Sequence, residues 1–285
     1  MPRLGIHTFV WTPAWDRKGA ELCIKNAAAA KLNTVEIALL DPDIVDVEHT
    51  RKTAEKAKIG LTCSLGLPAK ATLPDFPDEA EAFLRRALDV TKAVGASCLT
   101  GVTYATLGRL VGAPPKKEHY DILAKTLKKV ARYARSLGLE FGLEACNRYE
   151  TFLLNTGAQT ISLIERIGEP NVFLHLDTYH MNIEEKSFEK AIVSAGKHLK
   201  YIHLSESDRG TPGTGTVDWD GIFKGLRRAK FDGEMVMESF VNLPPDIARA
   251  LAVWKPVAAG GAKEVVGKGI PFLRRKMKQH GVNAG

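Results

Sequence analysis

Cysteine is scarce in this 285-residue sequence. The chain has 4 cysteines, at positions 23, 63, 98 and 146, and none of them forms a C-x-x-C pair. This spacing excludes the common zinc cages and a disulfide framework. We therefore expect four thiols that act as small apolar residues on strands, in a protein of the reducing cytoplasm.

Long apolar segments are also missing. No stretch approaches the roughly 20 apolar residues of a membrane-spanning helix, so we expect no membrane partner. The first residues, MPRLGIHTFVW, show no separate apolar run with a small-residue cleavage site, and we expect no signal peptide. Linkers rich in Pro or Gly are lacking too, which indicates a single domain over residues 1–285.

The net charge of +7 is spread along the chain. Lys and Arg recur in amphipathic segments such as LAKTLKKVARYARSL, a pattern typical of solvated helix faces. The segment FLRRKMKQH is locally basic but lacks the interleaved aromatic residues of a single-strand-binding surface. We therefore expect no nucleic-acid partner.

What the sequence does contain is a regular alternation of short apolar runs with longer amphipathic runs. The expected strands cover residues 4–10, 34–40, 61–67, 97–104, 139–145, 172–178, 199–206 and 233–240. The expected helices cover residues 19–31, 47–60, 78–95, 118–138, 156–168, 185–196 and 217–230, before a last helical region that runs to the end. At four helix ends the final glycine predicts a left-handed cap: Gly60, Gly95, Gly138 and Gly168.

Eight strand–helix units define the expected fold class. Alternating strands and helices imply a parallel sheet of the α/β class. Eight such units in about 250 residues indicate a closed (β/α)8 TIM barrel. An open doubly wound sheet is the alternative, but it usually has a glycine-rich turn after its first strand, where this chain has TFVWTPAWDRKGA.

Ionisable residues stand at the ends of the last four expected strands. They are Glu144, Asp177, His203 and Glu238, and the spacing of roughly 30 residues matches one strand–helix unit. Because TIM barrels work at the C-terminal ends of their strands, we expect the four side by side on that rim. Burying three carboxylates and an imidazole together is costly unless a cation neutralises them. The set predicts one divalent metal ion, Mn²⁺, Co²⁺ or Mg²⁺, and the absence of cysteine argues against structural zinc.

Four segments resemble a known family. They are EACNRYE (144–150), LDTYHMNIEE (176–185), HLSESDRGTPGTGTVDW (203–219) and MESF (237–240), and they resemble the D-tagatose 3-epimerases. This family includes the D-psicose (D-allulose) and L-ribulose 3-epimerases and belongs to the xylose-isomerase-like barrels. The resemblance implies metal ligation by the same four strand-end residues, and substrate contacts from Glu150, His180 and Arg209.

The resemblance also implies an activity, the interconversion of free ketoses at C3 by an isomerase. One of two glutamates, Glu144 or Glu238, would remove a proton, a cis-enediolate would form, and the other glutamate would return a proton to the opposite face. Carboxylates on two non-adjacent strands can face each other across a substrate and exchange roles. A metal can stabilise the developing enolate as a Lewis acid, while His180 and Arg209 can hold the carbonyl end.

Further residues near the strand ends are candidates for the pocket wall. His7 and Phe240 are expected to contact the substrate. Others could line the pocket or simply pack in the barrel: Phe9, Trp11, Trp15, Cys63, Gly66 and Tyr104. The stretch GVTYATLGRLVGAPP lacks a tryptophan that some family members place in the substrate wall, which leaves the preferred ketose open. We also expect a homodimer or homotetramer.

Several alternatives remain open at this point. The glycine-rich loop that begins at Arg209 (209–217) could hold the phosphate of a sugar phosphate, as loops after strand seven often do in barrels. A related barrel isomerase or lyase, acting on inososes, hydroxypyruvate or 3-keto-glycosides, would use a similar metal rim. An abasic-site endonuclease would need several metals and more histidine ligands than this rim offers. A non-catalytic sugar-binding barrel would not need the second glutamate ligand.

Overall fold

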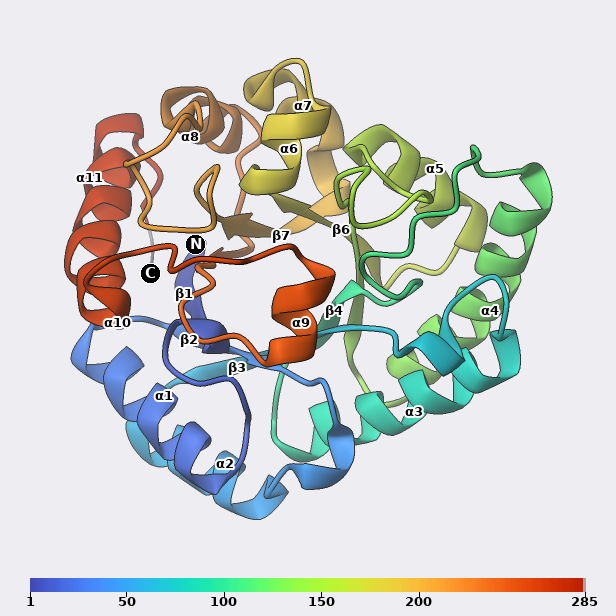
Figure 1. The fold of residues 1–285 in the computed structure, drawn as a ribbon, viewed down its shortest axis with the longest axis horizontal. Coiled ribbons are helices and arrows are strands. Elements are labelled where there is room, and N and C mark those ends of the chain that lie inside the picture. Colours follow the sequence, from blue (N-terminus) through green and yellow to red (C-terminus); the bar gives the residue numbers. More distant parts are fainter. Residues whose placement is uncertain (284–285) are drawn as a thin grey trace.

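Eight parallel strands close into a barrel in the computed structural model, which describes residues 1–283 (Figure 1). The strands are β1 (Arg3–His7), β2 (Thr34–Ala38), β3 (Gly60–Gly66), β4 (Cys98–Val102), β5 (Glu140–Glu144), β6 (Val172–Asp177), β7 (Leu199–Leu204) and β8 (Glu234–Met237). They follow one another in sequence order, and β1 closes the barrel by pairing with β8. The predicted TIM barrel is confirmed, and an open sheet is excluded.

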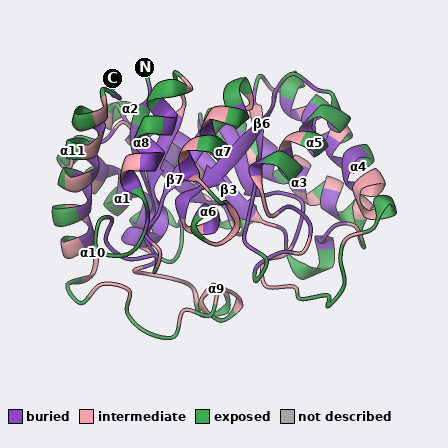
Figure 2. Ribbon diagram, turned by 90° about the horizontal axis from the view of Figure 1, so that it is seen from above, coloured by how far each residue is buried: buried purple, intermediate pink, exposed green. Residues whose placement is uncertain are grey.

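Helices surround the barrel with their buried faces turned inward (Figure 2), and these faces carry many apolar core residues. They are α1 (Arg17–Ala29), α2 (Val47–Ala57), α3 (Pro77–Ala93), α4 (Lys117–Ser136), α5 (Gly157–Ile167), α6 (Thr178–Glu184), α7 (Phe188–Ala195), α8 (Trp219–Arg228), α9 (Pro245–Ala250), α10 (Gly261–Glu264) and α11 (Ile270–His280). Short α9, with the loops beside it, lies across one open end of the barrel (Figures 1 and 2). None of the helices among residues 1–283 is long and apolar enough to cross a membrane.

The predicted glycine caps are correct at three of four positions. Gly95, Gly138 and Gly168 have φ angles of 80°, 73° and 68°, in the left-handed region that favours glycine. The prediction for Gly60 is wrong. Helix α2 ends at Ala57, the left-handed residue is Lys58, and the Gly60 N–H already pairs with the carbonyl of Asn33 as β3 begins.

Two further expectations need correction. All four cysteines are buried and free, but Cys23 lies on α1 and Cys146 follows β5, so only Cys63 and Cys98 are on strands. A small side chain fits the buried face of a helix as well as it fits a strand. The first expected strand also ends early, because residues 8–10 form a 3₁₀ turn after His7.

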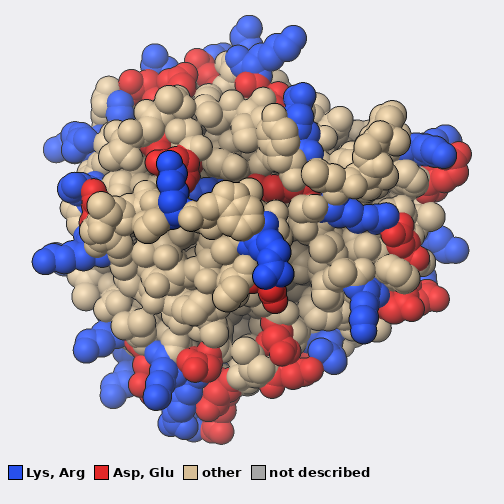
Figure 3. All heavy atoms as spheres, in the orientation of Figure 1, with Lys and Arg blue, Asp and Glu red and all other residues tan. Residues whose placement is uncertain are grey.

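Charged side chains of both signs are interspersed on the face that Figure 3 shows. Many lie in pairs one helical turn apart, such as Arg85 with Glu81 and Lys117 with Asp121. These pairs are typical of solvated helix faces. The net positive charge is therefore distributed over the helices, as the sequence predicted.

Candidate active site

Four strand ends bring the predicted ionisable residues together at the C-terminal rim. The Nδ1 atom of His203 lies 3.7 Å from Oε1 of Glu144, 3.9 Å from Oδ2 of Asp177 and 3.4 Å from Oε1 of Glu238. All four side chains are buried. The register of the sheet explains this cluster, because β6 and β7 pair with Asp177 directly beside His203.

The two ring nitrogens of His203 have different environments. Nε2 is 2.7 Å from a carboxylate oxygen of Glu36, while the buried Nδ1 has no hydrogen-bond partner among residues 1–283. A ring nitrogen that faces carboxylate oxygens, with its other nitrogen held by a carboxylate, is the usual environment of a metal-ligating histidine. Three carboxylates and one imidazole suit a hard or borderline divalent cation. The residues present therefore fit such an ion.

Glu36, on β2, is a buried residue of this site that the sequence analysis missed. Its Oε2 accepts hydrogen bonds at 2.7 Å from the Tyr201 hydroxyl and from Nε2 of His203. Burial favours the neutral acid, but His203 and His7 outweigh burial and lower the pKa of Glu36. An ionised Glu36 fixes the orientation of the His203 ring. The only signal in the sequence was one charged residue inside the apolar run TVEIALL.

The carboxylates of the cluster have raised pKa values. Burial is the main cause for Glu144, Asp177 and Glu238, and the charge of a neighbouring carboxylate adds to it in each case. Burial alone would lower the pKa of His203, but Glu238 and Glu36 outweigh burial and raise it well above its usual range. Buried, mutually interacting groups of this kind are typical of sites that transfer protons or hold cations.

Arg209 reaches the cluster from the loop that follows β7. Its Nη1 hydrogen-bonds Asp177 and Glu238, and its guanidinium lies 4.0 Å from the ring centre of Tyr179 and 4.4 Å from that of Phe240. Stacking on two aromatic rings and pairing with two carboxylates fix the planar group in one orientation. Arg209 is thus a well-positioned cation beside the predicted metal ligands.

His180 and Glu150 lie on the same side of the cluster and share a partner, Asn147. The backbone N–H of Asn147 and its side-chain Nδ2 both donate to Nδ1 of His180, at 3.1 and 2.8 Å, and Nδ2 also donates to Glu150. Burial and Arg209 hold the pKa of His180 well below its usual range, so the ring is neutral. Its Nε2 lies 3.2 Å from Nη2 of Arg209 and 3.7 Å from Oε1 of Glu144. Burial raises the pKa of Glu150 to about 7.

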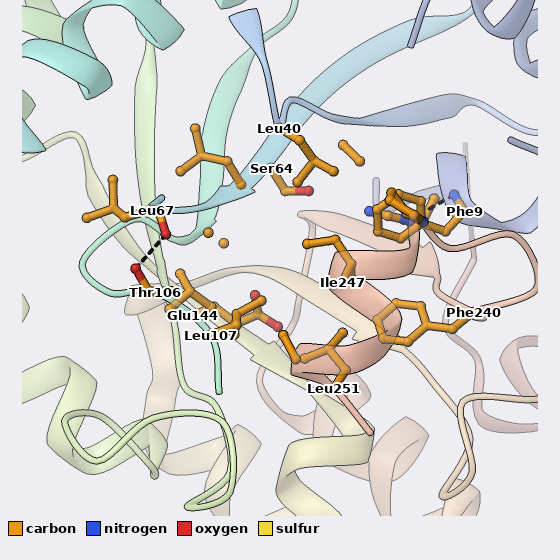
Figure 4. A pocket seen from close by; sticks show the side chains of 18 of the residues that line it. Phe9, Leu40, Ser64, Leu67, Thr106, Leu107, Glu144, Phe240, Ile247 and Leu251 are labelled. Atoms are coloured by element: carbon orange, nitrogen blue, oxygen red, sulfur yellow. Dashed lines mark hydrogen bonds between the residues drawn. The ribbon is translucent and has the colours of Figure 1, made fainter. Parts of the chain in front are cut away.

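A cavity of about 420 Å³ opens onto the cluster. Glu144, His203 and Glu238 line its polar end. Much of the remaining wall is apolar and comes from the loops after β1 to β4 and from the α9 region (Figure 4): Phe9, Leu40, Leu67, Leu107, Ile247 and Leu251. This shape suits a small molecule with one polar end and few polar contacts beyond it.

The structure also places the other candidate wall residues. His7, Phe9, Gly66 and Phe240 line the cavity. The remaining candidates are outside its lining: Trp11, Trp15, Cys63 and Tyr104. The Trp15 indole bonds Thr50, and the Tyr104 hydroxyl donates to the backbone carbonyl of Glu144 at 2.8 Å, so both have packing roles.

Known proteins that resemble this chain include sugar epimerases. Residues 24–257 match the family described as "Xylose isomerase-like TIM barrel". An L-ribulose 3-epimerase of Methylomonas sp. (strain DH-1) is 37% identical over 278 residues, which cover 95% of this chain and 96% of that protein. A ketose 3-epimerase of Arthrobacter globiformis is 36% identical over 282 residues, 96% of each chain.

A solved structure agrees with these relatives. The crystal structure of D-allulose 3-epimerase from Methylomonas sp. in complex with D-allulose has a TM-score of 0.92 and 36% identity, and the match covers 96% of this chain and 97% of that one. The chain is therefore a xylose isomerase-like TIM barrel. Within that class it belongs to the ketose 3-epimerase family, as the four sequence segments indicated.

Proposed function

We propose that this protein is a metal-dependent isomerase that interconverts free ketoses at C3. The observation that carries the proposal is the position of two buried glutamates, Glu144 at the end of β5 and Glu238 directly after β8, which line one cavity from strands that are not neighbours. Inverting one carbon requires an acid–base group on each of its faces. Family membership supports the same reaction.

The two glutamates carry out the proton transfer. One carboxylate removes the proton from C3 of the sugar, which becomes a cis-enediolate, and the other carboxylic acid returns a proton to the opposite face. Raised pKa values favour this exchange, because a group that is too acidic is a poor base. In the reverse reaction the two residues exchange roles.

Four residues would hold one divalent cation. Ligand atoms of Asp177, His203 and Glu238 lie within 4.8 Å of one another, and Glu144 joins them 3.7 Å from Nδ1 of His203. Mn²⁺ or Co²⁺ fits this set best, with Mg²⁺ as the alternative. When bound, the cation supplies Lewis-acid stabilisation of the charge that develops on the sugar oxygens. Its binding competes with the proton on His203, because that nitrogen must be deprotonated to act as a ligand.

The neighbouring residues hold the substrate. His180, Arg209 and Glu150 lie beside the cluster, outside the cavity lining, and bind the sugar oxygens that reach them. His7 and Phe240 contact the sugar, and the apolar wall excludes water from the reacting carbon. Four free cysteines support a cytoplasmic location. Exposed Leu110 and Trp254 support a homodimer or homotetramer.

A substrate panel tests the proposal. Free ketoses and ketose phosphates are incubated with the protein and added Mn²⁺ or Co²⁺, and the products are separated and identified. We expect C3 epimers, formed faster from free ketoses. The described residues lining the cavity include no Lys or Arg, and Asp246 lies there and would repel a phosphate. Arg209, beside the cluster, is already paired with Asp177 and Glu238. Faster turnover of any ketose phosphate would contradict the assignment.

Removing the carboxylate behind His203 should weaken metal binding. We expect Glu36→Gln to fold normally and to lose about 10- to 100-fold in divalent metal affinity, because the His203 ring loses its charged partner. Calorimetric titration with Mn²⁺ measures the effect. Glu234→Gln is the control, since Glu234 is a buried carboxylate at the other end of β8 that bonds Thr34 and Arg3. Unchanged affinity in folded Glu36→Gln would refute this role.

A further inference from the structure

A buried carboxylate occupies the centre of the glycine-rich loop that follows β7. Glu206 is fully buried, and each of its two carboxylate oxygens accepts two hydrogen bonds. Oε1 accepts from the backbone N–H groups of Ser207 and Val217, at 2.9 and 3.2 Å. Oε2 accepts from the backbone N–H of Gly213 at 2.7 Å and from the indole N–H of Trp219 at 3.0 Å. Although burial favours the neutral acid, these donors lower the pKa of Glu206.

Two glycines of the loop, Gly213 and Gly215, are explained by this carboxylate and by one neighbouring ring. A Cβ on Gly215 would lie 2.6 Å from Oε1 of Glu206 and 2.3 Å from the hydroxyl of Ser207. Gly213 has a φ of 91°, and a Cβ there would lie 2.6 Å from the ring of Phe272. Only glycine allows the backbone to approach these groups so closely.

The same hydrogen bonds bear on whether the loop binds phosphate. Converging backbone N–H groups form an anion-binding nest. Here three of these N–H groups donate to Glu206, and the N–H groups of Thr216 and Gly210 donate to side chains within the loop. The nest therefore already contains the chain's own anion, which argues against a phosphate-binding role for this loop.

The nest is connected to the active site through Arg209. The backbone N–H of Arg209 bonds the carbonyl of Glu206 at 3.0 Å, and its φ of 61° is in the left-handed region. A residue with a side chain adopts this conformation only where its surroundings hold it there. The Arg209 carbonyl accepts from the N–H of Phe240, and the Ser239 hydroxyl donates to the carbonyl of Gly210, so the loop is also fixed to the end of β8.

We propose that Glu206 is a positioning residue: an internal anion that holds loop 207–219 closed and so keeps the Arg209 guanidinium on the acidic cluster. The inference rests on the proposed function in so far as Arg209 serves epimerisation. The backbone N–H groups around Glu206 then form a carboxylate-binding nest, which an external small anion can fill when Glu206 is replaced by a shorter residue.

The test uses Glu206→Ala in the full-length, metal-loaded protein. We expect a folded variant with kcat for a free ketose reduced by about 10²-fold, the loss expected when a catalytic-site group is displaced. Added formate should restore at least part of this activity and raise the Tm of the variant, without either effect in the unmodified protein. Glu169→Ala is the matched control, because Glu169 is a buried carboxylate held by Arg132 and Arg135 away from the site.

A double-variant comparison separates positioning from general stability. If Glu206 acts through Arg209, then Glu206→Ala lowers kcat much less in an Arg209→Ala background than in the unmodified protein. Glu206→Gln, which keeps the size of the side chain, should show the same dependence if the alanine variant does not fold. Formate binding is measured as a Tm shift and does not depend on catalysis. Failure of the proposed reaction can therefore be distinguished from failure of the proposed role of Glu206. Full activity of Glu206→Ala, or an equal loss in both backgrounds, overturns the inference.

Discussion

Glutamine in place of Glu144 or Glu238 should reduce epimerisation by between about 10² and 10⁴-fold while the barrel stays folded. Each carboxylate is buried, lines the cavity and lies within 4 Å of the His203 ring. An amide has nearly the same shape but cannot remove a proton from carbon. Because the two groups exchange roles with the direction of reaction, each variant should lose activity in both directions.

The measurement must separate loss of the base from loss of the metal. Turnover of a free ketose is therefore compared with bound Mn²⁺ in the same sample, at metal concentrations that saturate the variant. Glu140→Gln is a suitable control, since Glu140 lies at the opposite end of β5 and pairs with Lys200 at the surface. Near-normal turnover in either metal-loaded glutamine variant would rule out the two-base scheme.

Chelation should abolish activity almost completely. We expect a loss of at least about 10³-fold, since Lewis-acid stabilisation contributes several kcal/mol to such transition states. Mn²⁺, Co²⁺ or Mg²⁺ should restore turnover. Metal should also raise the Tm, by about 5 °C at a hundredfold excess over Kd, because it neutralises three buried carboxylates that repel one another.

Loss of activity on metal removal can be tested directly. Protein freed of metal by dialysis against chelator, with its metal content measured, either loses turnover or keeps it. Full activity in the metal-free protein would mean that the cluster of Glu144, Asp177, His203 and Glu238 serves another purpose. The Glu36→Gln variant provides a graded comparison, since its weaker affinity should shift the restoring Mn²⁺ concentration upward.

The residues at the strand ends could be predicted from sequence because a simple rule connects them. In a TIM barrel the C-terminal ends of the strands form one rim. The spacing of the four ionisable residues was therefore enough to predict that they lie close together: Glu144, Asp177, His203 and Glu238. The family resemblance added roles that spacing alone could not assign. His180 and Arg209 lie beside this rim, 3.2 Å apart, and their roles stay predictions.

Other residues could not be predicted, because their partners are distant in sequence. Glu36 is 167 residues from His203, and nothing in the run TVEIALL shows which side chain it meets. Glu206 was expected as the last residue of the strand 199–206, but β7 ends at Leu204, and the hydrogen-bond donors to Glu206 extend to Trp219. Helix α6 was missed because it has only 7 residues, too few for a clear helical period.

The boundaries of the first strand show a different limit. Residues 8–10 are apolar, so the pattern extended the strand through them, but they form a 3₁₀ turn instead. Phe9 is apolar because it lines the cavity and packs against Phe240, with ring centres 5.9 Å apart. Hydrophobicity that serves a binding site has the same appearance in the sequence as hydrophobicity that serves the barrel wall.

The most direct test of the central claim is the reaction run in D₂O with a free ketose and followed by NMR. Removal and return of the C3 proton by two exchangeable carboxylic groups predicts deuterium at C3 of the product. Deuterium should also enter C3 of the recovered substrate as the reaction reverses. A 1,2-isomerase would label C1 or C2 instead, and a dehydratase would release water. Deuterium absent from C3 of the epimerised product would contradict the account.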